Sequence, residues 1–127
     1  MISLDTNVVL RFLIDDVPDQ TERVAQLVEQ NRVYVTDVVT VEIIYVLEKV
    51  LLLSRKDIAD LLRAFLGLSQ VVSNPYFLIN AIDLYEQHPR LSIVDCYAAS
   101  EAKAYNNQLA TFDKKLATQG GASIKEF

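Results

Sequence analysis

The stretch "MISLDTNVVLRFL" (residues 1–13) decides the fold, because it passes from one element to the next at a single acidic residue. Residues 1–4 predict a short buried strand, and residues 6–14 predict a helix that begins directly after Asp5. Further strands are predicted at 32–36, 70–72, 109–112 and 123–125, with helical periodicity between them. Strands that alternate with helices imply right-handed crossovers and a mostly parallel sheet with helices on both faces. We therefore expect an α/β fold.

Capping residues predict where the helices begin. A small polar or acidic residue can accept a hydrogen bond from the first turn of the helix that follows it, and a proline fits the first helical position. Helix starts are predicted at Asp19 (a capping box with Glu22), Thr36, Ser54, Asn74-Pro75 and Ser92. The glycine pair at 120–121 is expected to end the last short helix.

Length and composition limit the classes of protein to which this chain can belong. The 127 residues contain no visible linker or internal repeat, so we expect one domain over residues 1–127. A net charge of −5 argues against a protein that coats nucleic acid electrostatically, although bound divalent cations can reverse the local sign at an acidic site. The longest apolar run, 38–47, is too short to span a bilayer, and no signal peptide is evident. With a lone Cys96, these features lead us to expect a cytoplasmic protein without a membrane partner.

Four acidic residues stand in otherwise apolar sequence at the places where the chain changes element. They are Asp5, Glu42 in "VVTVEIIYVL", Asp95 in "LSIVDCYAAS" and Asp113 in "LATFDKKL". A carboxylate is costly to bury unless it is paired, neutralised or bound to a cation, and no apolar run supplies a matching basic residue. Ligands of such a sheet bind at the carboxyl ends of its strands. We therefore expect the four acids to meet there around a divalent metal.

Each acid also has a structural explanation. Asp5 and Asp113 could cap the helices that they precede. Asp95 stands three residues after Ser92 and could complete a capping box. A solvated helix face is a weaker explanation for Glu42, because its helix is apolar nearly all round. These alternatives stay open for each acid taken alone.

Short polar and basic residues accompany the acids. Asn7 and Thr111 fall at the same predicted sheet edge, where they could cap helices, orient carboxylates or hydrogen-bond waters on a metal. Lys114 and Lys115 would ordinarily be solvated, but beside Asp113 they could also hold a phosphate backbone.

Taken in order, the segments "LDTNVVLRFL", "VTVEIIYVLEK", "LSIVDCYAASEAK" and "LATFDKKL" resemble the PIN domain, in particular the small VapC-type toxins of type II toxin–antitoxin pairs. The resemblance covers the whole chain. It implies a three-layer α/β/α sandwich with a mostly parallel five-stranded sheet, and a magnesium- or manganese-dependent ribonuclease. It also implies a homodimer that a cognate antitoxin protein inhibits.

The resemblance carries over residue by residue. The metal-binding and catalytic acids would be Asp5, Glu42, Asp95 and Asp113. Asn7 matches the asparagine of the family's first motif, and Thr111 matches the polar residue two before the last acid. Many relatives have a further acid just after the fourth, where this chain has Lys114 and Lys115, so firm binding of a second metal without RNA is not expected.

The implied chemistry needs hard oxygen ligands, since magnesium prefers carboxylates, water and phosphate oxygens. Asp5 and Asp95 are expected to hold the principal ion, with Glu42 and Asp113 binding directly or through water. Water activated by the ion would attack phosphorus in line, leaving a 5′-phosphate and a 3′-hydroxyl. Two alternatives stay open. One is an aspartyl phosphatase or phosphotransferase, although the motif of such enzymes has a second acid at the position of Asn7. The other is a non-catalytic dimerisation or antitoxin-binding module using helices in 37–68.

Overall fold

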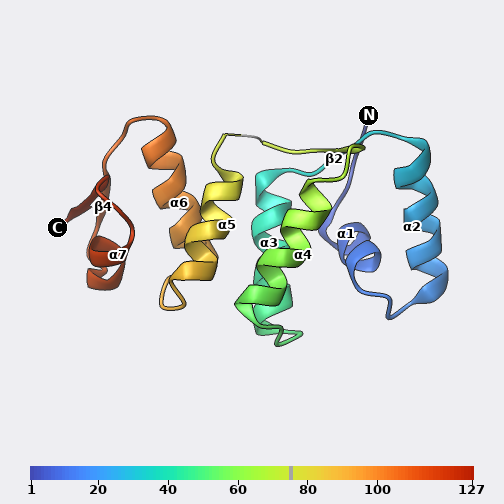
Figure 1. Cartoon of the computed structure of the whole chain (residues 1–127), viewed down its shortest axis with the longest axis horizontal. Helices are drawn as coiled ribbons and strands as arrows, with labels where there is room; N and C mark the ends of the chain where they lie inside the picture. Colours follow the sequence, from blue (N-terminus) through green and yellow to red (C-terminus); the bar gives the residue numbers. More distant parts are fainter. Residues whose placement is uncertain (75) are drawn as a thin grey trace. The chain divides into compact units, whose positions relative to one another are not determined.

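The computed structural model describes residues 1–74 and 76–127 and divides the chain into two compact units, Met1–Asn74 and Pro75–Phe127 (Figure 1). Each unit combines helices with parallel strands. The α/β class expected from the sequence is therefore confirmed. The expectation of one domain over residues 1–127 stays a prediction.

The first unit is a three-stranded parallel sheet with two helices in each connection. Its strands, in the order β1-β2-β3, are β1 (Ile2–Ser3), β2 (Val33–Tyr34) and β3 (Val71–Val72). Its helices are α1 (Thr6–Leu13) and α2 (Pro18–Gln30), then α3 (Asp37–Lys49) and α4 (Arg55–Leu66). Ile2 is in register with Val33, and Val33 with Val71. The carboxyl ends of the strands therefore share one edge, and α1 and α3 both begin there.

The second unit is a helical pair followed by a small parallel β-α-β element. Its elements are α5 (Leu78–Gln87), α6 (Ile93–Ala104), β4 (Leu109–Thr111), α7 (Lys114–Gln119) and β5 (Ile124–Glu126). Helices α5 and α6 pack side by side, and α7 connects the paired strands β4 and β5 (Figure 1). Asp113 stands between β4 and α7, at the carboxyl end of β4.

All five predicted strands form. The first four are shorter than expected, the last is shifted by one residue, and they are hydrogen-bonded as two sheets, β1-β2-β3 and β4-β5. A single five-stranded sheet is not confirmed. The expectation that residues 1–4 form a buried strand is wrong, because Ile2 and Ser3 are exposed and only Leu4 is buried. The reason is that β1 is an outer strand of its sheet, with β2 as its hydrogen-bonded neighbour.

Most predicted helix starts are confirmed by the hydrogen bonds at their caps. Thr36 Oγ1 accepts from the Val39 N–H at 3.2 Å, and Ser54 and Ser92 cap α4 and α6 in the same way. The capping box at Asp19 is wrong, because α2 already begins at Pro18, whose fixed φ suits the first helical position. The expected start at Asn74-Pro75 includes Pro75, which lies outside the described residues, and α5 begins at Leu78.

Buried aliphatic side chains hold the first unit together. Val9 on α1, Ile43 on α3 and Ile58 on α4 are fully buried. An edge-to-face ring contact of 5.6 Å also joins Phe12 on α1 to Phe65 on α4. Each such aliphatic side chain contributes about 1.5–3 kcal/mol when it is fully buried. This packing fixes α1 and α3, which carry candidate acids. No helix among the described residues is long and apolar enough to cross a membrane.

Candidate functional site

Asp5 is the N-cap of α1 at the carboxyl end of β1. Its Oδ1 accepts a hydrogen bond of 2.9 Å from the Val8 N–H. The capping explanation for Asp5 is therefore confirmed. It uses one carboxylate oxygen, however, and Oδ2 has no hydrogen-bond partner among the described residues of the first unit. The exposed side chain thus keeps one oxygen that can bind a ligand.

Glu42 lies in the second turn of α3 and is exposed. Its carboxylate makes no hydrogen bond or ion pair within the described part of residues 1–74. Val38 and Tyr45 flank it one turn away on either side, at 76% and 56% exposed. Glu42 therefore lies on a solvated helix face, contrary to the expectation from sequence. Helix α3 packs through residues such as Ile43, and Glu42 stands in an exposed apolar stripe on another side.

Asp95 lies in the first turn of α6 and is half-buried. Its backbone N–H donates to Ser92 Oγ at 3.1 Å, so Ser92 is the cap. The Asp95 carboxylate makes no hydrogen bond or ion pair with the described residues 76–127. The return bond of a capping box is therefore not formed, and both oxygens of Asp95 are available to a ligand.

Asp113 is the N-cap of α7 and is also half-buried. Its Oδ1 accepts from the N–H groups of Lys115 at 2.9 Å and Leu116 at 3.4 Å. The Asp113 N–H donates to Thr111 Oγ1 at 2.9 Å, so Thr111 helps to fix the turn that carries the acid. Lys114 and Lys115 are exposed beside it.

The four acids are less buried than the sequence suggested. Two are exposed and two are half-buried, so a desolvation cost does not by itself require a metal. Asp5 and Glu42 belong to the first unit, and Asp95 and Asp113 to the second. Within the described residues of either unit, no three His, Cys, Asp or Glu residues lie close enough to hold a metal ion. Convergence of all four stays a prediction, while their oxygen donors match what magnesium and manganese prefer.

A groove of about 570 Å³ between α1 and α2 is lined by Asn7, which the sequence singled out, and by three polar residues that it did not. Asn7 and Arg11 line it from α1, while Gln20 and Arg23 line it from α2. Arg11 is held by Gln20 Oε1 at 2.7 Å and Asp16 Oδ1 at 3.3 Å. Arg23 is exposed and makes no ion pair or hydrogen bond with the described residues of its unit. The i, i+4 spacing of Asn7 and Arg11 was the one sequence signal that placed them on a common face.

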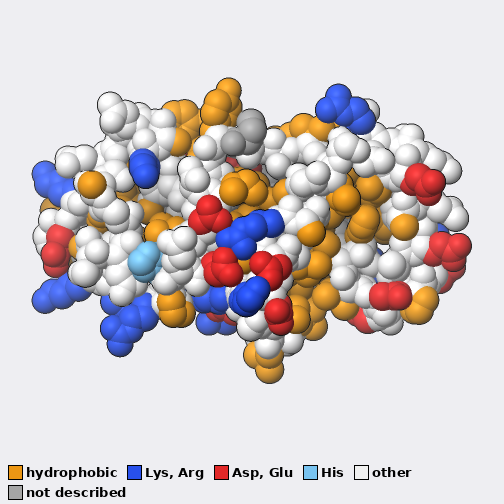
Figure 2. Space-filling model, in the orientation of Figure 1, with side chains coloured by type: hydrophobic (Ala, Val, Ile, Leu, Met, Phe, Trp, Pro, Cys, Tyr) orange, Lys and Arg blue, Asp and Glu red, His pale blue; other side chains and the backbone are white. Residues whose placement is uncertain are grey.

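Charged side chains of both signs lie on the face of the molecule that Figure 2 displays. Figure 2 shows acidic and basic side chains interspersed, without a broad basic patch over the described residues of that face. Proteins that coat nucleic acid usually carry such a patch.

Comparison with known families identifies the class of domain. A family model of the PIN domain matches residues 2–121, a range that contains all four candidate acids. No curated protein matches the chain. PIN domains are generally nucleases that act on nucleic acid and use divalent metal ions. Because the matched range spans nearly the whole chain, the chain belongs to the PIN domain family.

Proposed function

We propose that this protein is a magnesium- or manganese-dependent endoribonuclease and the toxin of a type II toxin–antitoxin pair. It hydrolyses RNA phosphodiester bonds to a 5′-phosphate and a 3′-hydroxyl in the cytoplasm. Its site consists of Asp5, Glu42, Asp95 and Asp113, brought together in one PIN domain with a single five-stranded sheet. Membership of the family supports a metal-using nuclease. The RNA substrate, the ion, the residues and the toxin role are what the proposal adds.

One observation carries the proposal: each of the four acids keeps at least one carboxylate oxygen without a partner among the described residues of its own unit. Asp5 and Asp113 use one oxygen for capping. An acid that is engaged in ion pairs is arranged differently. Asp60 binds Lys56 at 2.8 Å and Arg63 at 3.5 Å, and the hydrogen bond from Lys56 holds the pKa of Asp60 below its usual value. A metal site needs carboxylate oxygens that are available in this way.

The residues fit a hard divalent cation, since every proposed ligand is a carboxylate oxygen. Asp5 and Asp95 would hold the ion, with Glu42 and Asp113 binding directly or through water. When bound, the ion stabilises charge on the phosphate and makes water a better nucleophile. The chain itself supplies position. The cap bond of Asp5 fixes that carboxylate at the end of β1, and Thr111 fixes the turn at Asp113.

Basic side chains near the acids would position the RNA backbone. Arg23 lines the α1–α2 groove together with Asn7. Asn7 follows Asp5 by two residues in the chain. Lys114 and Lys115 follow Asp113 directly. Phosphate contacts of this kind fix register and orientation and do not read sequence. These residues are therefore assigned to substrate positioning.

The test is RNA cleavage by purified protein with magnesium, with manganese and with excess EDTA. We expect cleavage with either ion, none in EDTA, and 5′-phosphate ends. Glu42→Gln should abolish turnover, while Glu29→Gln, a matched change at an exposed helical glutamate, should not. Sustained cleavage in EDTA, or 2′,3′-cyclic phosphate ends, would contradict the metal mechanism.

The toxin role adds a homodimer and an antitoxin. Exposed apolar side chains on α3 and the turn after it offer a surface for both, with Tyr45 at 56%, Val50 at 65% and Leu52 at 80% exposed. We expect a dimer by light scattering and growth arrest on expression that co-expressed antitoxin relieves. A monomer whose expression never slows growth would contradict this part of the proposal. Trapping of phosphate on Asp5 would instead indicate an aspartyl phosphatase.

A further inference from the structure

A polar pocket lies within the second unit, apart from the candidate acids of that unit. Its volume is about 890 Å³, within the range of about 300–1,000 Å³ that is common for ligand sites. The C-terminal ends of α5, α6 and α7 contribute to its wall. Asp95 and Asp113 stand at the opposite, N-terminal ends of α6 and α7. The eight positions from Asp95 to Lys103 correspond to about 12 Å along α6.

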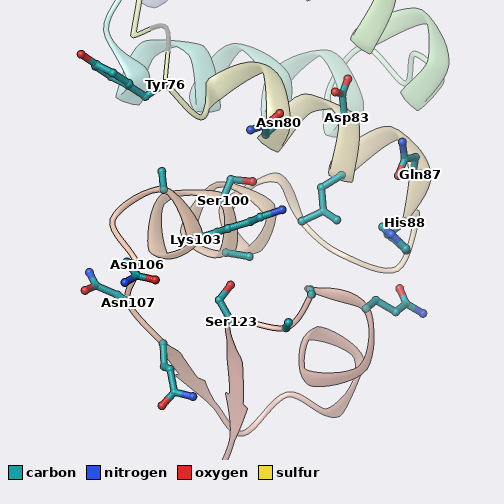
Figure 3. A pocket seen from close by; sticks show the side chains of 18 residues that line it. Tyr76, Asn80, Asp83, Gln87, His88, Ser100, Lys103, Asn106, Asn107 and Ser123 are labelled. Carbon is teal, nitrogen blue, oxygen red and sulfur yellow. The ribbon is translucent and has the colours of Figure 1, made fainter.

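Neutral hydrogen-bonding groups dominate the pocket. The carboxamides come from Asn80, Gln87, Asn106, Asn107, Gln108 and Gln119. Lys103 adds a cation, while Asp83, the acid among the described lining residues, points away from the centre in Figure 3. Helix C-termini carry partial negative charge, which disfavours a bare anion. The pocket therefore suits a neutral group with several donors and acceptors.

A mostly buried serine adds a hydroxyl to the pocket wall. Ser100 is 8% exposed and lines the pocket, and its hydroxyl has no hydrogen-bond partner among the described residues of the second unit. The hydroxyl is therefore available to hydrogen-bond a ligand or water in the pocket. Ser100 and Lys103 share a face of α6, and Figure 3 shows Ser123 pointing toward that helix from the opposite wall.

We propose that this pocket binds an unpaired nucleobase of a single-stranded RNA, with Lys103 on an adjoining phosphate. Carboxamides match the donor and acceptor pattern of base edges, and unpaired bases are what proteins read in RNA. A lysine matches the backbone beside such a base. The inference rests on the proposed function, because it adds a base-binding subsite at a nucleotide away from the cleaved bond. Asn107 is assigned to the base and Lys103 to the phosphate.

The test measures binding in EDTA, where cleavage does not interfere. The probes are fluorescent hexanucleotides of each of the four bases and an abasic oligomer of equal length. At least one hexanucleotide should bind with an affinity about fivefold or more above that of the abasic oligomer. Asn107→Ala should remove that difference. Lys103→Gln should weaken binding and lower the slope of log affinity against log salt by about 0.7, while the control Lys125→Gln should not. All the substituted side chains are exposed, so the variants should fold, and melting temperatures check this.

The same oligomers in magnesium separate this inference from the proposed function. If the wild type binds as described but never cleaves, the subsite stands and the nuclease assignment falls. If the wild type cleaves while Asn107→Ala and Lys103→Gln bind and cleave like it, the subsite is overturned and the nuclease stands. Equal affinity for the abasic oligomer, or no binding of any hexanucleotide, also overturns it.

Discussion

Asp95 and Asp57 occupy matched positions at the starts of two helices, so they allow catalysis to be separated from folding. Each is the third residue after a capping serine. The Asp95 N–H donates to Ser92 Oγ at 3.1 Å, and the Asp57 N–H donates to Ser54 Oγ at 3.1 Å. Each acid stands in the first turn of its helix. Replacement by asparagine keeps that backbone bond at either position and removes one negative charge near a helix N-terminus.

The expected loss of stability is small and similar for Asp95→Asn and Asp57→Asn. A carboxylate in the first turn contributes about 0.3–1 kcal/mol through the helix dipole. A change of about 1 kcal/mol moves the melting temperature of a domain of this size by roughly 2–8 °C. The loss of stability should be smaller for Asp95→Asn. Removing the half-buried charge of Asp95 also relieves a desolvation cost, whereas the exposed charge of Asp57 carries little such cost.

Activity should separate the two variants by orders of magnitude. Loss of a residue that only supports a metal ligand lowers metal affinity or activity by about 10- to 100-fold. Asp95→Asn alters a proposed ligand itself, so it should lower turnover by more than about 100-fold. Asp57→Asn should stay within about twofold. Scanning calorimetry in EDTA gives stability, and a fluorescence-quenched RNA with magnesium gives turnover. Equal turnover of the two variants, or a loss of turnover in Asp95→Asn that only follows unfolding, would show that Asp95 is not a catalytic ligand.

Other changes test other parts of the structure. Asp5→Asn should keep the cap and lose activity, whereas Asp5→Ala should also lose about 0.5–2 kcal/mol of stability in urea unfolding. Magnesium should raise the melting temperature of the wild type and not of Asp5→Asn, since a ligand stabilises only a native state that binds it. Gly120→Ala should destabilise the protein by about 1–3 kcal/mol in urea unfolding, because its Cβ would lie 2.6 Å from the Leu116 carbonyl oxygen. Leu52→Gly should leave stability unchanged or raise it by up to about 1 kcal/mol. Leu52 has a φ of 58°, which is strained for a residue with a side chain, and glycine relieves that strain. The side chain is 80% exposed, so little packing is lost, but the greater freedom of glycine in the unfolded chain opposes the gain. A clear loss at Leu52, measured in the same way, would show that its side chain is held by a partner surface.

Sequence predicted the parts of the fold that depend on short-range chemistry. Thr36, Ser54 and Ser92 cap helices where expected, because a capping bond joins residues only three apart. The start of α2 was misplaced because Pro18 satisfies the first helical position better than Asp19 satisfies the cap. Strand pairing joins residues that are far apart in the chain. The sequence therefore predicted where the strands lie but not that they pair as two sheets.

Features that depend on packing between elements were harder to predict. Helix α3 is apolar on more than one side, so composition alone could not tell that Glu42 is exposed between Val38 and Tyr45. Arg23 lies sixteen positions from Asn7 in the chain and reaches the same groove because α1 packs against α2. Neither side chain belongs to a pattern with a fixed spacing. The acids were visible in sequence, but their surroundings were not.

Helix capping and metal binding, which began as competing explanations for Asp5 and Asp113, are compatible in this structure. A cap bond uses one carboxylate oxygen and holds the side chain in one orientation. At Asp113 the Thr111 hydroxyl adds a second restraint on the turn. A functional carboxylate must be held firmly by its supporting residues before a ligand arrives. Capping therefore supplies the orientation at these two positions, and within its own unit the second oxygen remains available to the proposed ion.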